Sequence, residues 1–264
     1  MTFVVRCVTS NSTVQMLDAV ILCGGQGTRL ASVVSDVPKP LAPVLGRPFL
    51  DHLLALLCES GVVRSVTLAV HYRADRIAAY YADHPPPLPL RMVWETIPLG
   101  TGGAVMNCLG SIDGPRFLCI NGDSLCGGNL AALATASHAA GPAMTLGLVQ
   151  VPDTSRYGRS ILDNDGRIVD FSEKAASHGP GLVNAGIYAI AREALGTWSG
   201  EVLSMERDIL PRLVRERRLH GVTLSGPFID IGLPETYAAA ADFVRRLREE
   251  QAPGTRGQRD LPVR

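Results

Sequence analysis

The stretch of residues 19–44 constrains the fold of this chain more than any other. It opens with the five apolar residues 19–23, and a run of this length is typical of a buried strand in a parallel sheet. Gly24, Gly25 and Gly27 follow at once. Because glycine lacks a β-carbon, the backbone N–H groups of such a turn can approach a bound anion closely. We therefore predict a strand that ends in a phosphate-binding loop.

Three side chains after these glycines suit phosphate oxygens. Thr28 adds a hydroxyl, and Arg29 adds a rigid guanidinium fork that can donate two parallel hydrogen bonds. Lys39 lies between Pro38 and Pro40, and the two prolines predict an extended backbone that does not become a helix. The glycine loop, Arg29 and Lys39 together predict a site that holds a polyphosphate.

Two familiar glycine loops do not fit this stretch. A dinucleotide-binding G-x-G-x-x-G motif would need a third glycine where Leu30 stands, and it would open directly into a helix. A P-loop would need Lys followed by Ser or Thr, where this chain has Thr28 and Arg29. The stretch alone leaves one alternative open, a tight turn between a strand and a loop with a surface arginine.

Taken whole, the stretch resembles the signature of the sugar-1-phosphate nucleotidyltransferases, in which G-G-x-G-T-R-L is followed by P-K-P. Residues 35–44 are most similar to the branch that makes GDP-D-glycero-α-D-manno-heptose from the heptose 1-phosphate. The resemblance extends from about Asp18 to about Phe243. It implies an α/β fold of the Rossmann-like kind: a mostly parallel sheet with helices on both faces, and a smaller β-rich region that binds the sugar.

The order of strand-like and helix-like segments favours the same architecture. Up to residue 121 the two types alternate, which predicts right-handed crossovers and a mostly parallel sheet. The predicted strands of this half are residues 62–70, 91–94 and 117–120, and the predicted helices are residues 48–59 and 74–81. The second half has predicted strands at 143–151, 160–171 (a hairpin with its turn at 163–166) and 182–190, and helices at 205–218 and from 234 to about 250.

Composition and charge exclude several kinds of partner and site. The chain has 264 residues, and its 25 Lys and Arg balance 25 Asp and Glu, so nothing in its net charge favours nucleic acid or an anionic membrane as a partner. The six Cys form no metal-binding spacing, and no apolar run is long enough to span a membrane. We predict a cytoplasmic protein, for which a homo-oligomer is a possible state. Its parts would be an N-terminal extension (1–17), a nucleotidyltransferase domain (18–250) and a disordered tail (251–264).

Two aspartates are the candidate metal ligands. Asp123 follows the apolar strand predicted at 117–120, and Asp230 lies within the apolar run 228–231. A carboxylate in such surroundings is costly unless it is paired or bound to a metal, and ligands of open α/β sheets collect where strands end. The resemblance implies that both aspartates bind Mg²⁺ together with the nucleotide and the sugar phosphate. The alternative is that each merely caps the turn after its strand.

Glu95 is the candidate for reading the base. The resemblance implies that it ends a strand facing the base, with Gly100 supplying a backbone contact. A carboxylate can accept hydrogen bonds from both N1–H and N2–H₂ of guanine, whereas adenine offers a lone pair at that edge, so GTP is favoured over ATP. Relatives with other bases could also carry an acid here. The residues predicted to bind the nucleotide are Leu22, Cys23, Gly24, Gly25, Gly27, Thr28, Glu95, Gly100 and Thr101.

The resemblance also implies residues that bind the sugar phosphate: Gly158, Glu173, Lys174 and Asn184. Glu173 and Asn184 together offer acceptors and a donor for sugar hydroxyls, and Lys174 offers a point charge for the phosphate. A Glu-Lys pair is otherwise usually a solvated surface pair, so this assignment depends on the resemblance.

The reaction that the resemblance implies is attack of a sugar 1-phosphate oxygen on the α-phosphorus of an NTP, with release of pyrophosphate. Arg29, Lys39 and Asp123 are the predicted catalytic residues. No general base is needed, since the nucleophile is already an anion. Two alternatives stay open: a glucose or mannose 1-phosphate enzyme that uses another NTP, and a catalytically silent regulatory subunit that binds sugar nucleotides.

Overall fold

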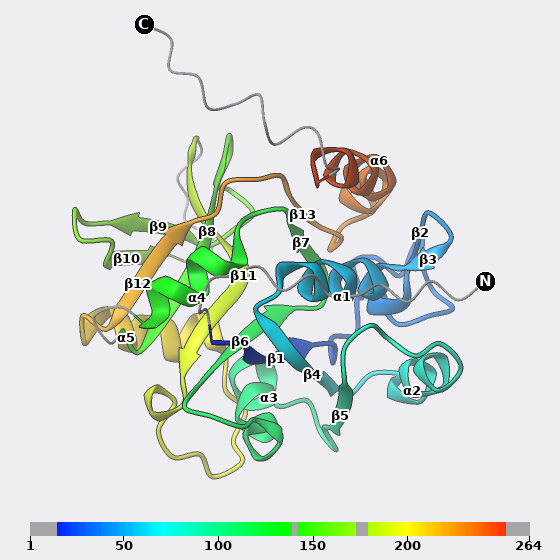
Figure 1. Cartoon of the computed structure of the whole chain (residues 1–264), viewed down its shortest axis with the longest axis horizontal. Helices are drawn as coiled ribbons and strands as arrows, with labels where there is room; N and C mark the ends of the chain where they lie inside the picture. Colours follow the sequence, from blue (N-terminus) through cyan, green and yellow to red (C-terminus); the bar gives the residue numbers. More distant parts are fainter. Residues whose placement is uncertain (1–14, 139–141, 173–178, 252–264) are drawn as a thin grey trace, which may run out of the picture.

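A nine-stranded sheet forms the centre of the protein, in a computed structural model that describes residues 15–138, 142–172 and 179–251 (Figure 1). Its strands are β1 (Leu17–Leu22), β4 (Val63–Val70), β5 (Leu90–Trp94), β6 (Arg116–Asn121), β8 (Met144–Val151), β9 (Arg159–Leu162), β10 (Ile168–Ser172), β11 (Gly181–Ala191) and β12 (Leu219–Thr223). Seven of them lie in the order β12-β8-β11-β6-β1-β4-β5, and the hairpin β9–β10 is added to the first half of β11.

The sheet is mostly parallel, as predicted. Strand β1 pairs in parallel with β4 and β6, β4 pairs in parallel with β5, and β8 pairs in parallel with β12. In the seven-strand path only β11 runs against its neighbours β6 and β8. The parallel strands therefore end at one common edge, which is where ligands bind in open α/β sheets.

Helices cover both faces of the sheet, which confirms that part of the prediction. One core contains side chains of α1 (Phe49–Ser60), α2 (Ala74–Asp83), α4 (Leu130–His138) and α6 (Pro234–Gln251); the other contains those of α3 (Gly100–Cys108) and α5 (Leu210–Arg215). The strands supply the two cores alternately: Ala19 and Ile21 of β1 lie in the first and Val20 in the second. This is the two-residue period expected of a strand buried on both faces.

Helix α1 shows how the pattern of apolar residues sets a boundary. Phe49, Leu50, Leu53, Leu54 and Leu57 recur at helical spacing and are all buried. The helix ends at Gly61, whose φ of 68° gives the left-handed conformation common at helix C-termini.

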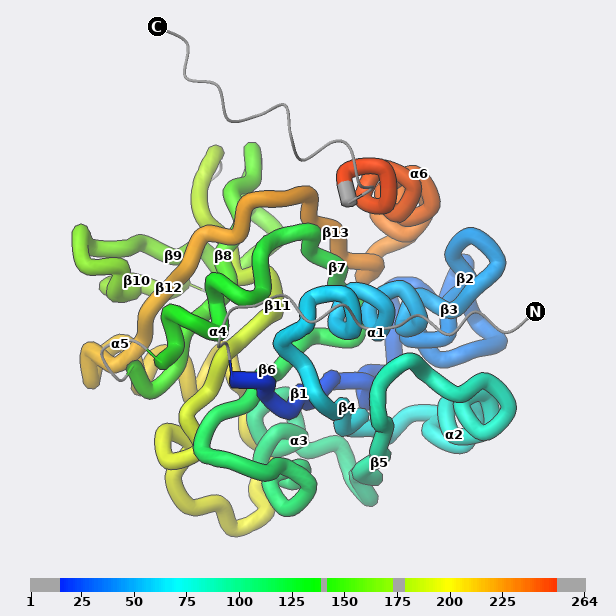
Figure 2. Tube along the Cα trace, in the orientation of Figure 1, coloured from blue at the N-terminus to red at the C-terminus, as the bar shows by residue number. Residues whose placement is uncertain are grey.

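A second, two-stranded sheet joins two distant parts of the chain. Strand β7 (Ser124–Cys126) pairs antiparallel with β13 (Phe228–Asp230), and the two lie side by side in Figures 1 and 2. The pairing sets Asp230 opposite Ser124, and the N–H of Ile231 donates to the carbonyl of Asp123 at 2.9 Å. The sequence did not predict these strands or β12, because each has at most two consecutive apolar residues and no hairpin turn marks it. The short hairpin of β2 (Pro43–Val44) and β3 (Arg47–Pro48) was also missed, because its strands have only two residues each.

Two local predictions were wrong. Lys39 begins a 3₁₀ turn (Lys39–Leu41) instead of staying extended. Only Pro38 is extended, because Pro40 falls in the first turn, where a missing N–H breaks no hydrogen bond. The helix predicted at 205–218 starts as a π-helical turn (Met205–Ile209) before α5. Pro211 cannot donate a hydrogen bond to the carbonyl four residues earlier, and this interrupts regular α geometry ahead of it.

The hairpin of β9 and β10 is as predicted. Its turn closes through hydrogen bonds from the N–H of Asp163 to the carbonyl of Arg167 and from Gly166 back to Asp163. The Asp163 carboxylate also accepts from two N–H groups within the turn.

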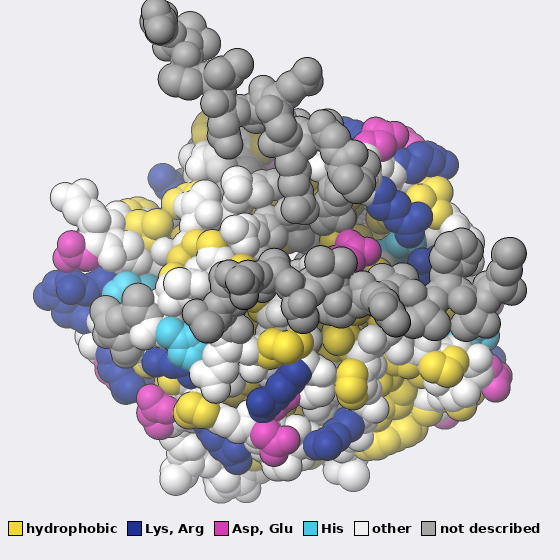
Figure 3. All heavy atoms as spheres, viewed as in Figure 1, with side chains coloured by type: hydrophobic (Ala, Val, Ile, Leu, Met, Phe, Trp, Pro, Cys, Tyr) yellow, Lys and Arg dark blue, Asp and Glu magenta, His cyan; other side chains and the backbone are white. Residues whose placement is uncertain are grey.

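Charged side chains are scattered over the face shown in Figure 3, with the Lys and Arg side chains interspersed with Asp and Glu. This pattern agrees with the balanced formal charge of the chain. No helix among the described residues combines the length and the apolar character needed to cross a membrane.

Candidate active site

Two cavities adjoin at the edge where the parallel strands end, and they share Asn121 and Asp123. The first has a volume of about 370 Å³ and is lined by Leu22, Cys23, Gly24, Gly25, Gln26, Lys39, Pro40, His71, Glu95, Pro98, Gly100, Thr101, Ala104, Asn121, Gly122 and Asp123. The second has a volume of about 360 Å³ and is lined by Arg29, Asn121, Asp123, Ser124, Ser155, Arg156, Tyr157, Asn184, Ala185, Gly186, Phe228, Asp230 and Leu233.

The first cavity brings together most residues predicted to bind a nucleotide. Leu22 and Cys23 end β1, and the glycine loop that follows forms one wall. Gly24 faces Glu95: a β-carbon at Gly24 would lie 2.9 Å from Oε1 of Glu95. Any larger residue would therefore displace the carboxylate. Gly27 and Thr28, also predicted, line neither cavity, and Gly27 packs against the side chain of Lys39.

Glu95 follows β5 directly and is almost completely buried. Its Oε2 accepts a hydrogen bond from the N–H of Leu99 at 3.0 Å, and its carbonyl lies 2.8 Å from Nδ1 of His71. Burial raises the pKa of the Glu95 carboxyl above its usual 4.5, and the Leu99 N–H opposes that shift only in part. The other oxygen, Oε1, is directed toward Gly24 in the wall of the cavity.

Gly100 and Thr101 begin helix α3 at the same cavity. Gly100 has a φ of 74° and packs on the carbonyl of Leu203, so it could not be replaced without strain. The hydroxyl of Thr101 donates to Glu206 at 2.8 Å and accepts from the N–H of Met205 at 2.8 Å. Its proton is thus engaged within the protein.

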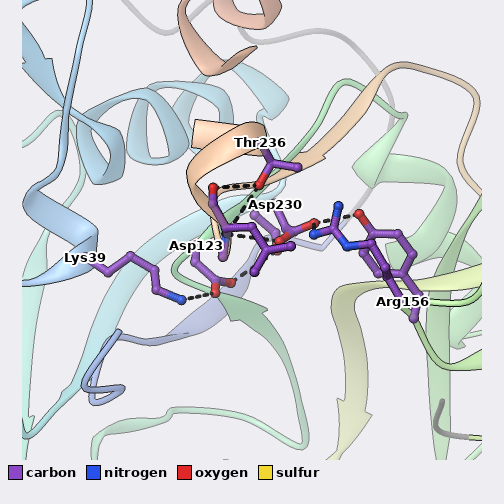
Figure 4. A network of polar contacts seen from close by, with 9 residues as sticks. Lys39, Asp123, Arg156, Asp230 and Thr236 are labelled. Atoms are coloured by element: carbon purple, nitrogen blue, oxygen red, sulfur yellow. Dashed lines mark hydrogen bonds and ion pairs between the residues drawn. The ribbon is translucent and has the colours of Figure 1, made fainter. Parts of the chain in front are cut away.

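The two predicted metal ligands lie next to each other, held by the pairing of β7 with β13. Figure 4 shows Lys39 on one side of them and Arg156 on the other. Nζ of Lys39 is 2.9 Å from Oδ2 of Asp123. Asp230 accepts from the hydroxyl of Tyr157 at 2.6 Å and lies 3.5 Å from the Arg156 guanidinium.

The start of helix α6 fixes the chain just after Asp230. The N–H of Gly232 donates to Oδ1 of Asp230 at 3.0 Å. Thr236, also drawn in Figure 4, exchanges hydrogen bonds with the N–H and carbonyl of Leu233. Pro234 stands at the first helical position, where proline is favoured.

The donor set fits a cation that protein and substrate hold together. Among the described residues, no three or more His, Cys, Asp or Glu side chains gather as a metal-binding group. Mg²⁺ is commonly bound by one or two carboxylates, with phosphate oxygens and water as its other ligands. Asp123 and Asp230 are both partly exposed and both line the second cavity, which matches that requirement.

The second cavity receives residues predicted for different tasks. Asn184, predicted to bind the sugar phosphate, lies there as expected. Arg29, predicted to bind the polyphosphate, also lines this cavity and not the first. Gly158 lines neither cavity; its carbonyl accepts from the N–H of Asn184 at 3.1 Å. Glu173 and Lys174 lie outside the described residues.

Sequence reasoning assigned no role to Asn121, Tyr188 or Glu206. Asn121 lines both cavities, and its Oδ1 is buried without a hydrogen-bond partner among the described residues. Its position at the end of a predicted strand, two residues before Asp123, could have identified it. Tyr188 hydrogen-bonds to Asn184, and Glu206 hydrogen-bonds to Thr101. The second contact joins segments that lie far apart in the sequence, and no local pattern identified either residue.

Comparison with known proteins adds independent findings. Residues 18–246 match the family described as Nucleotidyl transferase. The chain is 34% identical to mannose-1-phosphate guanylyltransferase of Mycobacterium tuberculosis, over 92% of this chain and 68% of that protein. It is 32% identical to D-glycero-alpha-D-manno-heptose 1-phosphate guanylyltransferase of Campylobacter jejuni, over 84% of this chain and 97% of that protein.

The fold also matches solved structures. A crystal structure of HddC from Yersinia pseudotuberculosis superposes with a TM-score of 0.77 and 33% identity, covering 86% of this chain and 99% of HddC. The structure of HddC complexed with GMP-PN gives a TM-score of 0.76 with the same coverage.

Proposed function

This chain belongs to the nucleotidyl transferase family, and on that premise we propose that it joins GTP to D-glycero-α-D-manno-heptose 1-phosphate. The products would be the GDP-heptose and pyrophosphate. The observation that carries the proposal is the pair of adjoining cavities that share Asp123. One cavity holds the glycine loop and the other holds Asn184, so two phosphorylated ligands could meet at this carboxylate.

The chemistry needs orientation and charge neutralisation. A phosphate oxygen of the sugar 1-phosphate attacks the α-phosphorus, a new P–O bond forms, and the bond to the bridging oxygen of the leaving pyrophosphate breaks. Holding the two reactants in line can supply about 7–11 kcal/mol of the barrier. Lys39, Arg29 and Arg156 line the cavities and would neutralise phosphate oxygens during this step. Asp123 and Asp230 would hold Mg²⁺, which would polarise the α-phosphate when bound.

The base preference rests on Glu95. Guanine presents two adjacent donors, N1–H and N2–H₂, and the ionised carboxylate can accept both, since each oxygen has two acceptor sites. The hydrogen bond from Leu99 uses one such site and fixes the carboxylate in place. The two relatives compared above are both guanylyltransferases, and HddC was crystallised with GMP-PN, which supports GTP as the nucleotide.

Mannose 1-phosphate is the second candidate for the sugar. The Mycobacterium tuberculosis relative, at 34% identity, is named for that substrate. The heptose is favoured because the chain spans 97% of the Campylobacter jejuni heptose enzyme and because residues 35–44 resemble that branch. A catalytically silent subunit is disfavoured, because Arg29, Lys39 and both aspartates are retained and line the cavities. Magnesium dependence, a cytoplasmic location and self-association stay predictions.

A pyrophosphate-release assay tests the proposal. GTP, ATP, UTP and dTTP would each be combined with the heptose, mannose and glucose 1-phosphates in the presence of Mg²⁺. We expect the highest kcat/KM with GTP and the heptose 1-phosphate. A preference for mannose 1-phosphate would select the second candidate, and equal use of GTP and ATP would reject the role given to Glu95. No pyrophosphate with any pair would contradict the enzymatic function.

A further inference from the structure

A chain of hydrogen bonds connects the two cavities through the interior of the protein. Nδ2 of Asn184, in the second cavity, donates to the hydroxyl of Tyr188 at 2.8 Å. That hydroxyl donates to Oε1 of Glu206 at 3.1 Å. The other carboxylate oxygen, Oε2, accepts from the hydroxyl of Thr101 at 2.8 Å, and Thr101 lines the first cavity. We call Asn184, Tyr188, Glu206 and Thr101 the connecting network.

The network is anchored to the backbone at both ends. At the second cavity, Oδ1 of Asn184 accepts from the N–H of Gly186 at 2.9 Å. At the first cavity, the hydroxyl of Thr101 accepts from the N–H of Met205. The carbonyl of Leu203 accepts from the N–H groups of the next two residues of α3, Gly102 and Gly103, at 2.8 and 3.0 Å. A shift of the network would therefore move the start of α3 as well as Asn184.

Glu206 is the centre of the network. Its carboxylate accepts from three hydroxyls, those of Thr101, Tyr188 and Ser204. It stands on the π-helical turn that precedes α5, and such turns are frequent at functional sites. Tyr188, on β11, is only 1% exposed, so this polar contact is inside the core. Buried networks of this kind hold one arrangement because a lost partner leaves a polar group unpaired.

The direction of each hydrogen bond determines what the cavities can offer a ligand. Tyr188 gives its proton to Glu206 and so can only accept from Asn184, which fixes the orientation of the amide. Asn184 keeps one N–H and one lone pair, which suit a sugar hydroxyl. Thr101 has given its proton to Glu206, so its oxygen can only accept from a ligand in the first cavity. Glu206 thus sets the hydrogen-bonding character of a residue in each cavity.

We propose that Glu206 is a positioning residue that couples the two cavities. The inference rests on the proposed function, since it places a nucleotide in the first cavity and a sugar phosphate in the second. A ligand that shifts Asn184 toward its bound position also shifts Tyr188, Glu206 and Thr101, because the hydrogen bonds of the network move together, so the second ligand meets a site that is already arranged. Each substrate then binds more tightly in the presence of the other. Coupling between two sites is typically about 5–150-fold in affinity.

Calorimetric titration with an unreactive nucleotide measures this coupling. The α,β-methylene analogue of GTP would be titrated into the whole protein, with and without saturating D-glycero-α-D-manno-heptose 1-phosphate. For the wild type we expect the sugar phosphate to tighten nucleotide binding at least about fivefold. In Glu206→Gln and Tyr188→Phe we expect this factor, taken as the ratio of the two nucleotide affinities of the same variant, to fall below about twofold. Gln cannot accept at both ends of the network, and Phe removes the link itself.

Asp208→Asn is the matched control. It makes the same carboxylate-to-amide change on the same turn, at a residue whose carboxylate accepts only from the N–H of Ser204 within the described part of the chain. We expect it to retain the coupling. The double variant Tyr188→Phe/Glu206→Gln should lose no more coupling than either single variant, since both act on one path. If Tyr188→Phe proves unfolded in a thermal melt, Glu206→Gln carries the test.

Several results would overturn the inference. Wild-type coupling in Glu206→Gln, an equal loss in Asp208→Asn, or no coupling in a wild type that binds both ligands would each reject it. If the wild type bound neither the GTP analogue nor the sugar phosphate, the proposed function itself would fail, and the inference with it. Binding of each ligand alone therefore separates the two failures.

Discussion

The amino and carboxyl ends of two neighbouring parallel strands, β1 and β6, show carboxylates used in two different ways. At its amino end, Asp18 is only 2% exposed and accepts from Arg64 twice at 2.8 Å, from Ser65 at 2.6 Å and from the N–H of Asp113 at 2.7 Å. At the carboxyl end of the sheet, the Asp123 side chain is 32% exposed and its closest partner is Lys39 at 2.9 Å.

The difference in partners explains the difference in use. The Arg64 guanidinium, with Ser65 and the Asp113 N–H, lowers the pKa of Asp18 to about 2, against the opposing effect of burial. Its oxygens are occupied within the protein, so this carboxylate stabilises the fold and has little to offer a ligand. Asp123 keeps acceptor sites that face two cavities. The sheet thus separates a structural carboxylate from one available for binding.

The largest effect is expected at the available carboxylates. Asp123→Asn and Asp230→Asn should each lower kcat by about 10³-fold or more, because each removes a charge that would hold Mg²⁺ against the reacting phosphates. Circular dichroism and a thermal melt should show a folded protein. Near-normal turnover of both variants at saturating Mg²⁺ would contradict the role of these two carboxylates as metal ligands.

The cations beside these carboxylates come next. Lys39→Ala and Arg29→Ala should each raise the barrier by about 3–4 kcal/mol, measured from kcat/KM, since both charges would act on phosphate oxygens in the transition state. Arg29→Lys should recover only part of the loss, because an ammonium group cannot replace a bidentate guanidinium. A change in thermal stability alone in Arg29→Ala would make the loop a structural feature.

Glu95 tests whether a buried carboxylate can also serve a ligand. Glu95→Gln should lower the preference for GTP over ATP by about 10–100-fold and leave the preference among sugars much less affected, since one guanine donor loses its partner. The pKa of Glu95 is raised, so the ionised form that accepts guanine is lost at a higher pH than for a free glutamate. The GTP preference of the wild type should therefore fall as pH falls through this raised pKa. A pH profile of the preference that is identical in Glu95→Gln would contradict this role.

Substitution of Asp18 should give the smallest effect, and that effect should be on stability and not on turnover. Its pKa falls from 3.8 to about 2 on folding, which corresponds to about 2 kcal/mol of stability. Because the folded pKa is depressed, this stability is present above pH 3.8 and is lost as the pH falls toward 2. Urea unfolding of Asp18→Asn should show that deficit at pH 7 and a shrinking one below pH 3.8, with kcat unchanged. A large loss of kcat without a loss of stability would contradict the structural role given to Asp18.

The sequence predicted the parts of the site that lie at strand ends. Strand β1, the glycine loop and the strand before Asp123 have apolar runs of the right length with a clear break after each. Asp230 was also identified, but its position beside Asp123 was implied only by the resemblance and not by the pattern of the residues. The pairing that joins them involves two strands of three residues each, about a hundred positions apart, and no periodic pattern specifies such a contact.

Other features were not predicted, either because a local pattern suits two conformations or because a contact depends on tertiary packing. The turn at Lys39 was predicted to be extended from the prolines alone, yet their positions also suit a 3₁₀ turn. Arg29 follows the glycine loop in the chain but lines the second cavity. Glu206 meets Thr101 and Tyr188 only because α3, β11 and the π-helical turn pack together. Neither β12 nor β13 could be read from its few residues.

Phosphorus NMR of the complete reaction tests the central claim most directly. The wild-type protein would be incubated with GTP, D-glycero-α-D-manno-heptose 1-phosphate and Mg²⁺. We predict that the sugar phosphate signal disappears while two coupled diphosphate signals of a GDP-sugar and the single signal of pyrophosphate appear together. Unchanged GTP and heptose 1-phosphate, or release of orthophosphate without a GDP-sugar, would contradict it.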